Sequence, residues 1–340
     1  MNPVRRLDRK LATIAAGRYT ATDFILADAK DADMAFGVAA PGPVPGTPPE
    51  GAGRPGHFRT RATYLDEMRA GITGGALDIM LTSASNGERL VADGWPDPDV
   101  TLAIRGNDTT DIWHPRGASY ATHASRPFRT ADLSRIRRFC DLVLYSCTFN
   151  GDLERDLATA EAYRAFRHEA ADLGVRHFLE VFNPNAPTGI DPARVGSFVN
   201  DWIIRVLAGV TTDERPIFLK VAYNGADTLR ELAEHDPSLV VGVLGGSAGT
   251  TRDTFELLRR AEANGARVAL FGRKVQRAES QGDLLALMRR VVERELDPEP
   301  AVHAYRAALA AGGRTPVRSL TEDLALTDPV LLAEVEAGAA

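Results

Sequence analysis

Cysteine is scarce in this sequence, and so is any recognisable set of metal ligands. The two cysteines, Cys140 and Cys147, have a spacing that fits neither a metal-binding motif nor a disulfide framework. The seven histidines do not gather at predicted strand ends, and His114 and His123, which share one loop, do not indicate a zinc pair. We therefore expect no metal ion and no other cofactor. The unpaired thiols are typical of a cytoplasmic protein.

Long apolar segments and an excess of positive charge are also missing. No run is long enough to predict a membrane span, and the basic N-terminus lacks the apolar segment of a signal peptide. A net charge of −6 argues against nucleic-acid binding but leaves room for a small cationic pocket. With 44% apolar and 25% charged residues, the composition is that of an ordinary globular protein. The expected partner is a small molecule.

Eight short apolar runs recur along the chain and alternate with helical patterns. They cover residues 23–31, 76–85, 99–108, 140–149, 176–184, 215–225, 239–249 and 266–275. Because these runs are continuously apolar, they predict parallel strands covered on both faces. Eight strand–helix units in 340 residues predict an α/β fold of the (β/α)8 (TIM) barrel type. An open doubly wound sheet would need a glycine-rich fingerprint after the first strand, where the sequence reads DAKDADMAFG instead.

The predicted barrel domain spans residues 1–296, and a helical extension over 297–340 is a candidate contact for a homo-oligomer. Two loops, 36–60 and 107–130, exceed the usual length and follow the first and third strands. Both leave the carboxyl ends of strands, the face where barrel active sites lie. The second loop carries aromatic and histidine residues and predicts a substrate lid. The first fits a lid or a tolerated insertion equally well.

Polar side chains accumulate at the carboxyl ends of the predicted strands, which converge on one pocket in a barrel. So many ionisable groups within apolar runs carry a desolvation cost that a purely structural core would avoid. The members without an assigned role include Asp31, Asn107, Asp108, Ser146 and Asn224. The predicted substrate-binding residues are Lys30, Ser85, Arg105, Asn183 and Tyr223.

Two glycine-rich turns follow the seventh and eighth predicted strands. GGSAGT (245–250) opens a helix, and FGRKV (271–275) closes the barrel. Such turns let backbone N–H groups approach phosphate oxygens, and the amino terminus of the helix that GGSAGT opens favours an anion. Barrels often bind phosphate at these strand ends. Simple tight turns are the alternative. The predicted phosphate site comprises Gly245, Gly246, Ser247, Gly272 and Arg273.

Lys220 interrupts the apolar run RPIFLKVAYNG (215–225). Burial favours a neutral amine, and a neutral amine attacks a ketone or aldehyde to form a Schiff base. Breaking or forming a C–C bond at the adjacent carbon then needs a group that moves protons. Glu180, on the preceding strand, is the first candidate, followed by Tyr145, Tyr223 and Asp28. The alternative is a buried ion pair of Lys220 with one of these carboxylates and no catalytic use.

The segments FLKVAYNG, GGSAGTTRDTFELLRRAEANGA and ALFGRKV resemble the C-terminal half of the class I aldolase superfamily. This superfamily includes deoxyribose-phosphate, tagatose-bisphosphate and archaeal-type fructose-bisphosphate aldolases, and the resemblance covers roughly residues 140–295. It implies that Lys220 is the Schiff-base lysine, that the two glycine-rich turns bind phosphate, and that Asp28 is the acidic residue of the first strand. Glu180 corresponds to the strand-five glutamate of the tagatose-bisphosphate group.

The sequence departs from these families at two places. Phe182 and Asn183 stand where the archaeal fructose-bisphosphate type has a tyrosine, and the fourth strand lacks the second lysine of the tagatose group. We predict a metal-independent class I aldolase, or a related lyase of carbohydrate metabolism, acting on a phosphorylated ketose or keto acid. One alternative is a sugar-phosphate isomerase or lyase that uses Glu180 and Asp28 without an imine. The other is a non-catalytic barrel that senses a phosphate ligand.

Overall fold

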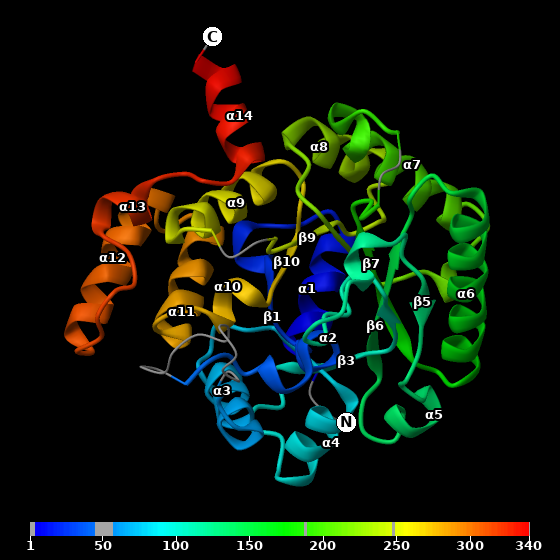
Figure 1. Cartoon of the computed structure of the whole chain (residues 1–340), viewed down its shortest axis with the longest axis horizontal. Helices are drawn as coiled ribbons and strands as arrows, with labels where there is room; N and C mark the ends of the chain where they lie inside the picture. Colours follow the sequence, from blue (N-terminus) through cyan, green and yellow to red (C-terminus); the bar gives the residue numbers. More distant parts are fainter. Residues whose placement is uncertain (1–3, 45–56, 187–188, 247–248, 340) are drawn as a thin grey trace.

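The computed structural model describes residues 4–44, 57–186, 189–246 and 249–339. Eight parallel strands close into a barrel in the order β1-β10-β9-β8-β7-β6-β3-β2, which confirms the predicted TIM barrel (Figure 1). Each strand lies within one of the eight predicted apolar runs. Their bounds are β1 (Ile25–Lys30), β2 (Ile79–Thr82), β3 (Thr101–Arg105), β6 (Leu142–Thr148), β7 (Arg176–Phe182), β8 (Leu219–Val221), β9 (Gly242–Leu244) and β10 (Val268–Phe271).

Helices surround the barrel and bury the outer faces of its strands (Figure 1). Thr250 begins the helix after β9 with a capping box, because its side chain accepts from the N–H of Asp253 and Asp253 accepts from the N–H of Thr250. The bounds are α3 (Arg61–Thr73), α4 (Ala84–Ala92), α5 (Leu133–Ile136), α6 (Leu153–Asp172), α7 (Val195–Leu207), α8 (Ala226–His235), α9 (Thr251–Ala263), α10 (Arg273–Gln276) and α11 (Gln281–Val292).

Alternate residues of each strand face opposite sides of the barrel wall. The inward-facing side chains form one cluster, which we call the interior cluster; it contains Ile25, Ala27, Ala29, Ile79, Leu81, Ala103, Leu142, Leu144, Phe178, Phe218, Val268 and Leu270. Outward-facing residues such as Met80, Tyr145 and Leu219 belong to a second, larger cluster under the helices. This alternation decides which strand-end residues reach the barrel mouth.

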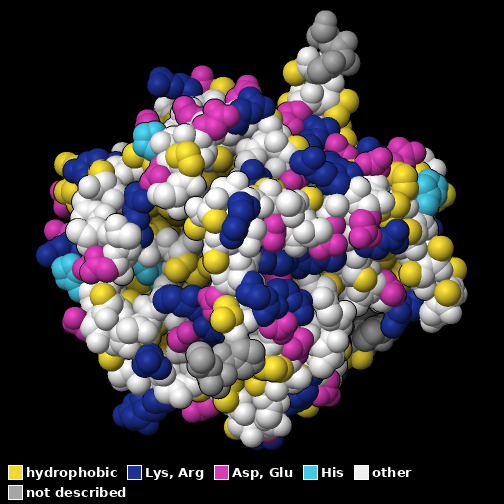
Figure 2. All heavy atoms as spheres, turned by 180° about the vertical axis from the view of Figure 1, so that it is seen from behind, with side chains coloured by type: hydrophobic (Ala, Val, Ile, Leu, Met, Phe, Trp, Pro, Cys, Tyr) yellow, Lys and Arg dark blue, Asp and Glu magenta, His cyan; other side chains and the backbone are white. Residues whose placement is uncertain are grey.

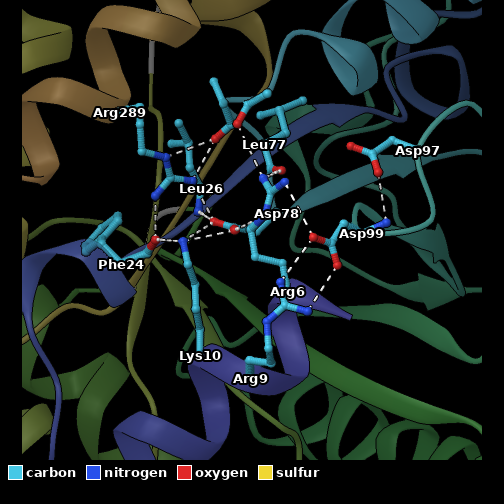
Figure 3. A network of polar contacts seen from close by, with 12 residues as sticks. Arg6, Arg9, Lys10, Phe24, Leu26, Leu77, Asp78, Asp97, Asp99 and Arg289 are labelled. Atoms are coloured by element: carbon cyan, nitrogen blue, oxygen red, sulfur yellow. Dashed lines mark hydrogen bonds and ion pairs between the residues drawn. The ribbon is translucent and has the colours of Figure 1, made fainter. Parts of the chain in front are cut away.

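The N-terminal helix α1 (Arg6–Ala15) packs against the interior cluster from the amino-terminal end of the strands through the fully buried Leu7. Asp78, just before β2, is the centre of the polar network there (Figure 3). Its carboxylate lies 2.9 Å from Lys10 Nζ and 2.6 Å from an Arg289 nitrogen, and it accepts from the N–H of Leu26 at 2.8 Å. This network ties together the closed end of the barrel, opposite the carboxyl ends of the strands where barrel active sites lie.

Asp78→Ala should lower the free energy of unfolding by about 3 kcal/mol, because it leaves two largely buried cations without their shared carboxylate. Urea unfolding followed by circular dichroism measures the loss. Asp99→Ala is the matched control, since Asp99 pairs with the exposed Arg9 at 3.1 Å on the same face. It should cost less than about 1 kcal/mol. Equal losses for the two variants would contradict the assignment of Asp78 as the central residue.

The chain ends in three helices, α12 (Pro298–Ala311), α13 (Leu320–Leu324) and α14 (Pro329–Ala339). Helix α12 packs on α9 and α11 and buries Val302 and Leu309. Helix α14 projects from the body and exposes hydrophobic side chains, Leu332 and Val335 among them (Figures 1 and 2). In the part of the chain that the structure describes, no helix combines the length and apolar character of a bilayer-spanning segment.

Candidate active site

Five polar side chains meet inside the carboxyl-terminal mouth of the barrel. Each follows the inward-facing positions of its own strand: Asp31 follows Ala27 and Ala29, Arg105 follows Ala103, Ser146 follows Leu144, Glu180 follows Phe178, and Lys220 follows Phe218. All five are buried or nearly so. The interior of the barrel is therefore apolar along the strands, and charged and polar side chains form its last layer at the mouth.

Lys220 and Glu180 are direct neighbours across β7 and β8, where they are register partners. Lys220 Nζ lies 2.6 Å from Glu180 Oε1. The other carboxylate oxygen, Oε2, accepts a hydrogen bond of 2.7 Å from the hydroxyl of Ser146 on β6. One carboxylate oxygen therefore faces the amine while the other is fixed by a neutral donor.

Arg105 on β3 organises the opposite side of this layer. Its guanidinium lies 2.6 Å from Asp31 Oδ2 and 3.4 Å from Asp108 Oδ1, and it donates to Ser146 Oγ at 2.9 Å. Burial alone would lower the pKa of Arg105, but the carboxylates of Asp31, Glu180 and Asp108 raise it, so the side chain stays charged. Burial raises the pKa of Asp108 to about 6. The positive charge of Arg105 is thus already matched by protein carboxylates.

These groups line a cavity of about 180 Å³ that opens at the barrel mouth. Its polar lining includes Lys220, Glu180, Arg105, Asp31 and Arg273. The rest of the lining is apolar or glycine: Ala29, Ala32, Ala35, Phe36, Ile112, Phe182, Leu244, Gly245, Gly246, Leu270 and Gly272, together with His114. A space of this size accommodates a small metabolite, and its polar groups are few and convergent, as in enzyme sites generally.

The start of the first long predicted loop contacts the second long loop at this cavity. The backbone N–H of His114, in the loop after β3, donates to the carbonyl of Ala35 at 2.8 Å. The imidazole ring of His114 stacks on Phe36 at a centroid distance of 5.3 Å. Short strands β4 (Asp108–Thr109) and β5 (Pro127–Phe128) pair at the base of the same loop. The second loop therefore contributes to the lining through Ile112 and His114, and the first, among its described residues, through Phe36 at the end of α2 (Asp33–Phe36).

The glycine-rich turns lie on one side of the cavity, where Gly245, Gly246, Gly272 and Arg273 are brought together. A Cβ at Gly272 would lie 2.7 Å from the carbonyl oxygen of Ala29, so the close approach of this turn to β1 requires glycine. The N–H of Gly245 donates to Leu270 at 3.2 Å, so Gly245 shapes its turn but does not supply a free donor. Ser247 lies outside the described residues.

The amino terminus of α9 differs from the expectation that it would attract a phosphate. Thr251 N–H donates to the carboxylate of Asp323 at 2.9 Å, and Thr250 N–H donates to Asp253 at 2.9 Å. Protein carboxylates therefore already occupy donors of this first turn. Any phosphate at this side of the barrel would be held by the turns and by Arg273, whose pKa is lowered by burial and by the neighbouring Arg277.

The chain has only four lysines, and the structure separates them clearly. Lys220 alone of the four lines the cavity. Lys10 binds Asp78 at the closed end of the barrel. Lys30 is the last residue of β1, and its amine donates to the side chain of Gln281 at the start of α11 at 2.9 Å. Lys274 on α10 borders a different cavity beneath the C-terminal helices, and burial lowers its pKa to about 8.

Asp28 and Lys30 do not reach the cavity, contrary to their predicted roles in catalysis and substrate binding. They are outward-facing residues of β1, with the carboxylate of Asp28 3.3 Å from Lys30 Nζ under the outer helices. Burial raises the pKa of Asp28 to about 6 and lowers the pKa of Lys30. Asp31, three residues later, takes the position at the mouth for which Asp28 had been predicted.

Tyr145, a predicted catalytic residue, is also on the outer face of the barrel. Its ring packs against Tyr163 and Phe166 of α6 at centroid distances of 5.1 and 4.5 Å. The next residue, Ser146, points inward instead and contacts Glu180.

Three of the predicted substrate-binding residues also lie away from the cavity lining. Tyr223 donates to the carboxylate of Glu334 on α14 at 2.9 Å, and Asn183 pairs with Asn224 through two amide hydrogen bonds of 2.7 and 2.9 Å. Ser85 is exposed on α4. Arg105 is the member of this predicted set that does line the cavity.

The sequence had a signal for the residues that replace them. Asp31 and Ser146 were visible as polar strand-end residues, but no role followed from the apolar runs alone. Ala27, Ala29 and Ala103 belong to the inward-facing interior cluster, beside larger members such as Phe178 and Phe218. Counting in steps of two from these alanines leads to Asp31 and Arg105.

The placement of Asp28 and Lys30 yields a direct test. We expect the double substitution Asp28→Asn and Lys30→Met to leave covalent trapping of a carbonyl substrate within about twofold of the unmodified protein, because a buried ion pair removed as a unit is replaceable. Intact mass after borohydride reduction measures the trapped fraction. Asp31→Asn is the comparison inside the cavity, and it should lower the trapped fraction because Arg105 loses its closest partner. A larger loss of the trapped fraction in the Asp28→Asn and Lys30→Met double variant than in Asp31→Asn would indicate that Asp28 belongs to the site.

No protein-family model matches this chain, and no curated protein sequence matches it significantly. A Schiff-base-forming fructose-1,6-bisphosphate aldolase matches its structure with a TM-score of 0.59 and 14% identity, covering 84% of this chain and 99% of that chain. An archaeal fructose-1,6-bisphosphate aldolase, with its catalytic lysine covalently bound to a carbinolamine intermediate, matches with a TM-score of 0.59 and 13% identity over the same shares.

This chain has the fold of the Schiff-base aldolases. A protein from Corynebacterium glutamicum is similar as well, with a TM-score of 0.56 and 19% identity over 85% of this chain and 93% of that chain. At these identities the likeness to Schiff-base aldolases extends to the barrel and its topology. The reaction has to be argued from the side chains in the cavity.

Proposed function

We propose that this protein is a class I aldolase or a related lyase, which forms or cleaves a C–C bond in a phosphorylated ketose or keto acid through an imine on Lys220. The observation that carries the proposal is the position of the Lys220 amine. It lies inside the cavity, 2.6 Å from Glu180 Oε1, with the glycine-rich turns on the neighbouring strands β9 and β10.

The pairing of Lys220 and Glu180 gives each a chemical role. Glu180 Oε1 is placed to take a proton from the ammonium, and the resulting amine attacks the substrate carbonyl. The same carboxyl group then returns the proton to the carbinolamine oxygen, which leaves as water and gives the iminium. Ser146 holds the other carboxylate oxygen and so keeps Oε1 directed at the reacting atoms.

The iminium withdraws electrons from the adjacent bond, so that in the cleavage direction this C–C bond breaks and its electron pair forms an enamine. A proton leaves the hydroxyl of the departing fragment as that fragment becomes an aldehyde or ketone. Glu180 is the carboxylate closest to Lys220 for this transfer. Proton transfer by such a positioned group contributes roughly 10²- to 10⁴-fold to the rate.

A phosphate group is the natural anchor for a substrate in this cavity. Arg273 and the turns at Gly246 and Gly272 lie at the ends of the strands where barrels commonly bind phosphate. The anchor would hold the substrate carbonyl close to Lys220 on β8, which adjoins β9 in the barrel.

Borohydride reduction tests the proposal directly, because it converts a transient imine into a stable secondary amine. The protein is incubated with dihydroxyacetone phosphate, pyruvate and a panel of sugar phosphates, reduced, and analysed by intact mass. We expect an added mass equal to the reduced adduct of at least one donor. If no donor adds mass while a sugar phosphate is still isomerised or cleaved, the carboxylate-only mechanism replaces the imine.

A further inference from the structure

The cavity contains three side chains with a permanent or readily gained positive charge, apart from His114: Lys220, Arg105 and Arg273. Two of them are matched by the protein itself. Lys220 lies against Glu180 at 2.6 Å, and Arg105 lies against Asp31 at 2.6 Å with Asp108 at 3.4 Å. Within the described residues, Arg273 forms no ion pair. Among the described lining residues, an unpaired arginine or lysine charge therefore lies only at the end of the cavity where Arg273 is.

That end is fixed by the order of the strands. Arg273, Gly272 and Gly246 follow β10 and β9, and Lys220 on the adjacent β8 comes next around the barrel. Beyond Lys220, in the direction of β7, β6 and β3, the lining contains the apolar Phe182 and Ile112 together with Glu180 and Arg105, whose charges are paired within the protein. A substrate anchored at Arg273 and bonded to Lys220 would therefore extend its far fragment toward an apolar wall.

The loop residues complete the same wall. Phe36, stacked on the ring of His114, closes the cavity from the loop after β1, and Ala32 and Ala35 lie beside it. The other charged lining residues on this side of the cavity are Asp31, Glu180 and Arg105, and each is already paired within the protein: Asp31 with Arg105 and Glu180 with Lys220. A second anionic group placed here would lose its hydration and meet no unmatched cation among the residues that the structure describes, which is costly in a confined site.

We infer that the substrate carries a single phosphate, bound by Arg273 and the turns at Gly246 and Gly272, and that the fragment beyond the reacting bond is an uncharged, apolar aldehyde. This aldehyde lies against Phe36, Ile112 and Phe182. The inference rests on the proposed function and narrows it to monophosphate substrates. A bisphosphate would place its second anion against the apolar wall.

In the synthetic direction the atoms balance without a cofactor. The amine of Lys220 condenses with a phosphorylated ketone, releasing water, and loss of a proton from the adjacent carbon gives the enamine. The enamine carbon attacks the aldehyde carbon, a new C–C bond forms, and the aldehyde oxygen takes up a proton to become a hydroxyl. Water then hydrolyses the iminium, which frees the product and the amine.

Two four-carbon aldehydes test the inference because they differ in charge. The full-length protein is supplied with dihydroxyacetone phosphate as donor at pH 8, where a histidine is ordinarily neutral, and with either butanal or succinic semialdehyde. We expect kcat/KM for butanal to exceed that for succinic semialdehyde by about tenfold or more. Equal or better use of the anionic aldehyde overturns the inference.

Failure of the inference and failure of the proposed function give different results. Borohydride trapping of dihydroxyacetone phosphate alone, without any aldehyde, reports on imine formation and not on the far wall. Trapping combined with a preference for succinic semialdehyde retains the aldolase proposal and rejects the apolar aldehyde. If this donor is not trapped, a donor that is trapped replaces it in the aldehyde comparison; absence of trapping with every donor rejects both proposals.

A substitution at the wall provides a second readout. Ile112→Lys adds a cation to the apolar wall and should shift the ratio of the two kcat/KM values toward succinic semialdehyde by about tenfold. Val317→Lys, at a position that is 80% exposed, adds the same charge outside the cavity and should leave the ratio unchanged. An equal shift in both variants would show a general charge effect and overturn the assigned wall.

Discussion

Lys220→Arg should abolish the borohydride-trapped adduct and lower the rate of C–C bond cleavage or formation by roughly 10³-fold or more. Arginine keeps a positive charge beside Glu180, so the ion pair of 2.6 Å has a replacement and the barrel mouth retains its charge balance. A guanidinium stays protonated and does not form an imine. The variant therefore separates the chemistry of the amine from the stability that its charge provides. Intact mass and steady-state turnover measure the two effects.

The matched control for this substitution is Lys274→Arg. Lys274 is the lysine whose pKa is lowered to about 8 by burial, which makes it the strongest competitor as a reactive amine. It borders a cavity near Tyr305 and Arg318 and does not line the barrel mouth. We expect full trapping in Lys274→Arg. Trapping that survives in Lys220→Arg but disappears in Lys274→Arg would move the reactive amine to the other cavity.

Glu180→Gln should lower turnover by roughly 10²- to 10⁴-fold while a borohydride-trapped adduct still forms, more slowly, on Lys220. Glutamine has the shape of glutamate and its amide oxygen can accept the hydrogen bond from Ser146. It cannot take a proton from the ammonium or return one to a leaving oxygen. Single-turnover kinetics with mass detection distinguishes slow imine formation from a slow C–C step.

A buried carboxylate elsewhere provides the control for Glu180. Glu262 on α9 is 3% exposed and binds Arg294 at 2.8 Å, far from the cavity lining, so Glu262→Gln should affect unfolding but not turnover. Turnover within about twofold of the unmodified protein in Glu180→Gln would mean that another group moves the protons. Asp31 would then be the next carboxylate to substitute, because it also lines the cavity.

The arrangement of strands followed from the sequence because each strand is a continuous apolar run bounded by turn residues. The same continuity concealed which face of each strand points inward. A strand buried on both sides shows no alternation of polar and apolar residues, and a shift of one residue exchanges its two faces. This is why Tyr145 was favoured over Ser146, and why Asp28 was favoured over Asp31.

Contacts between distant segments were a second source of error. Tyr223 stands two residues beyond β8, but its hydroxyl is bound by Glu334 of α14, more than a hundred residues later in the chain. The amino terminus of α9 is likewise occupied by Asp323 of the C-terminal extension. No local sequence pattern predicts such long-range partners. The proximity of Lys220 and Glu180 was predictable because they lie on consecutive strands of the barrel.

Peptide mapping after borohydride reduction shows directly whether Lys220 is the reactive amine. The protein is reduced in the presence of the donor that gives the largest added mass, digested, and sequenced by tandem mass spectrometry. Only four lysines compete for the adduct. We expect the added mass to be located on Lys220. Its location on Lys10, Lys30 or Lys274, or the absence of any covalent adduct with every donor, would contradict the assignment of Lys220 as the amine that forms the imine.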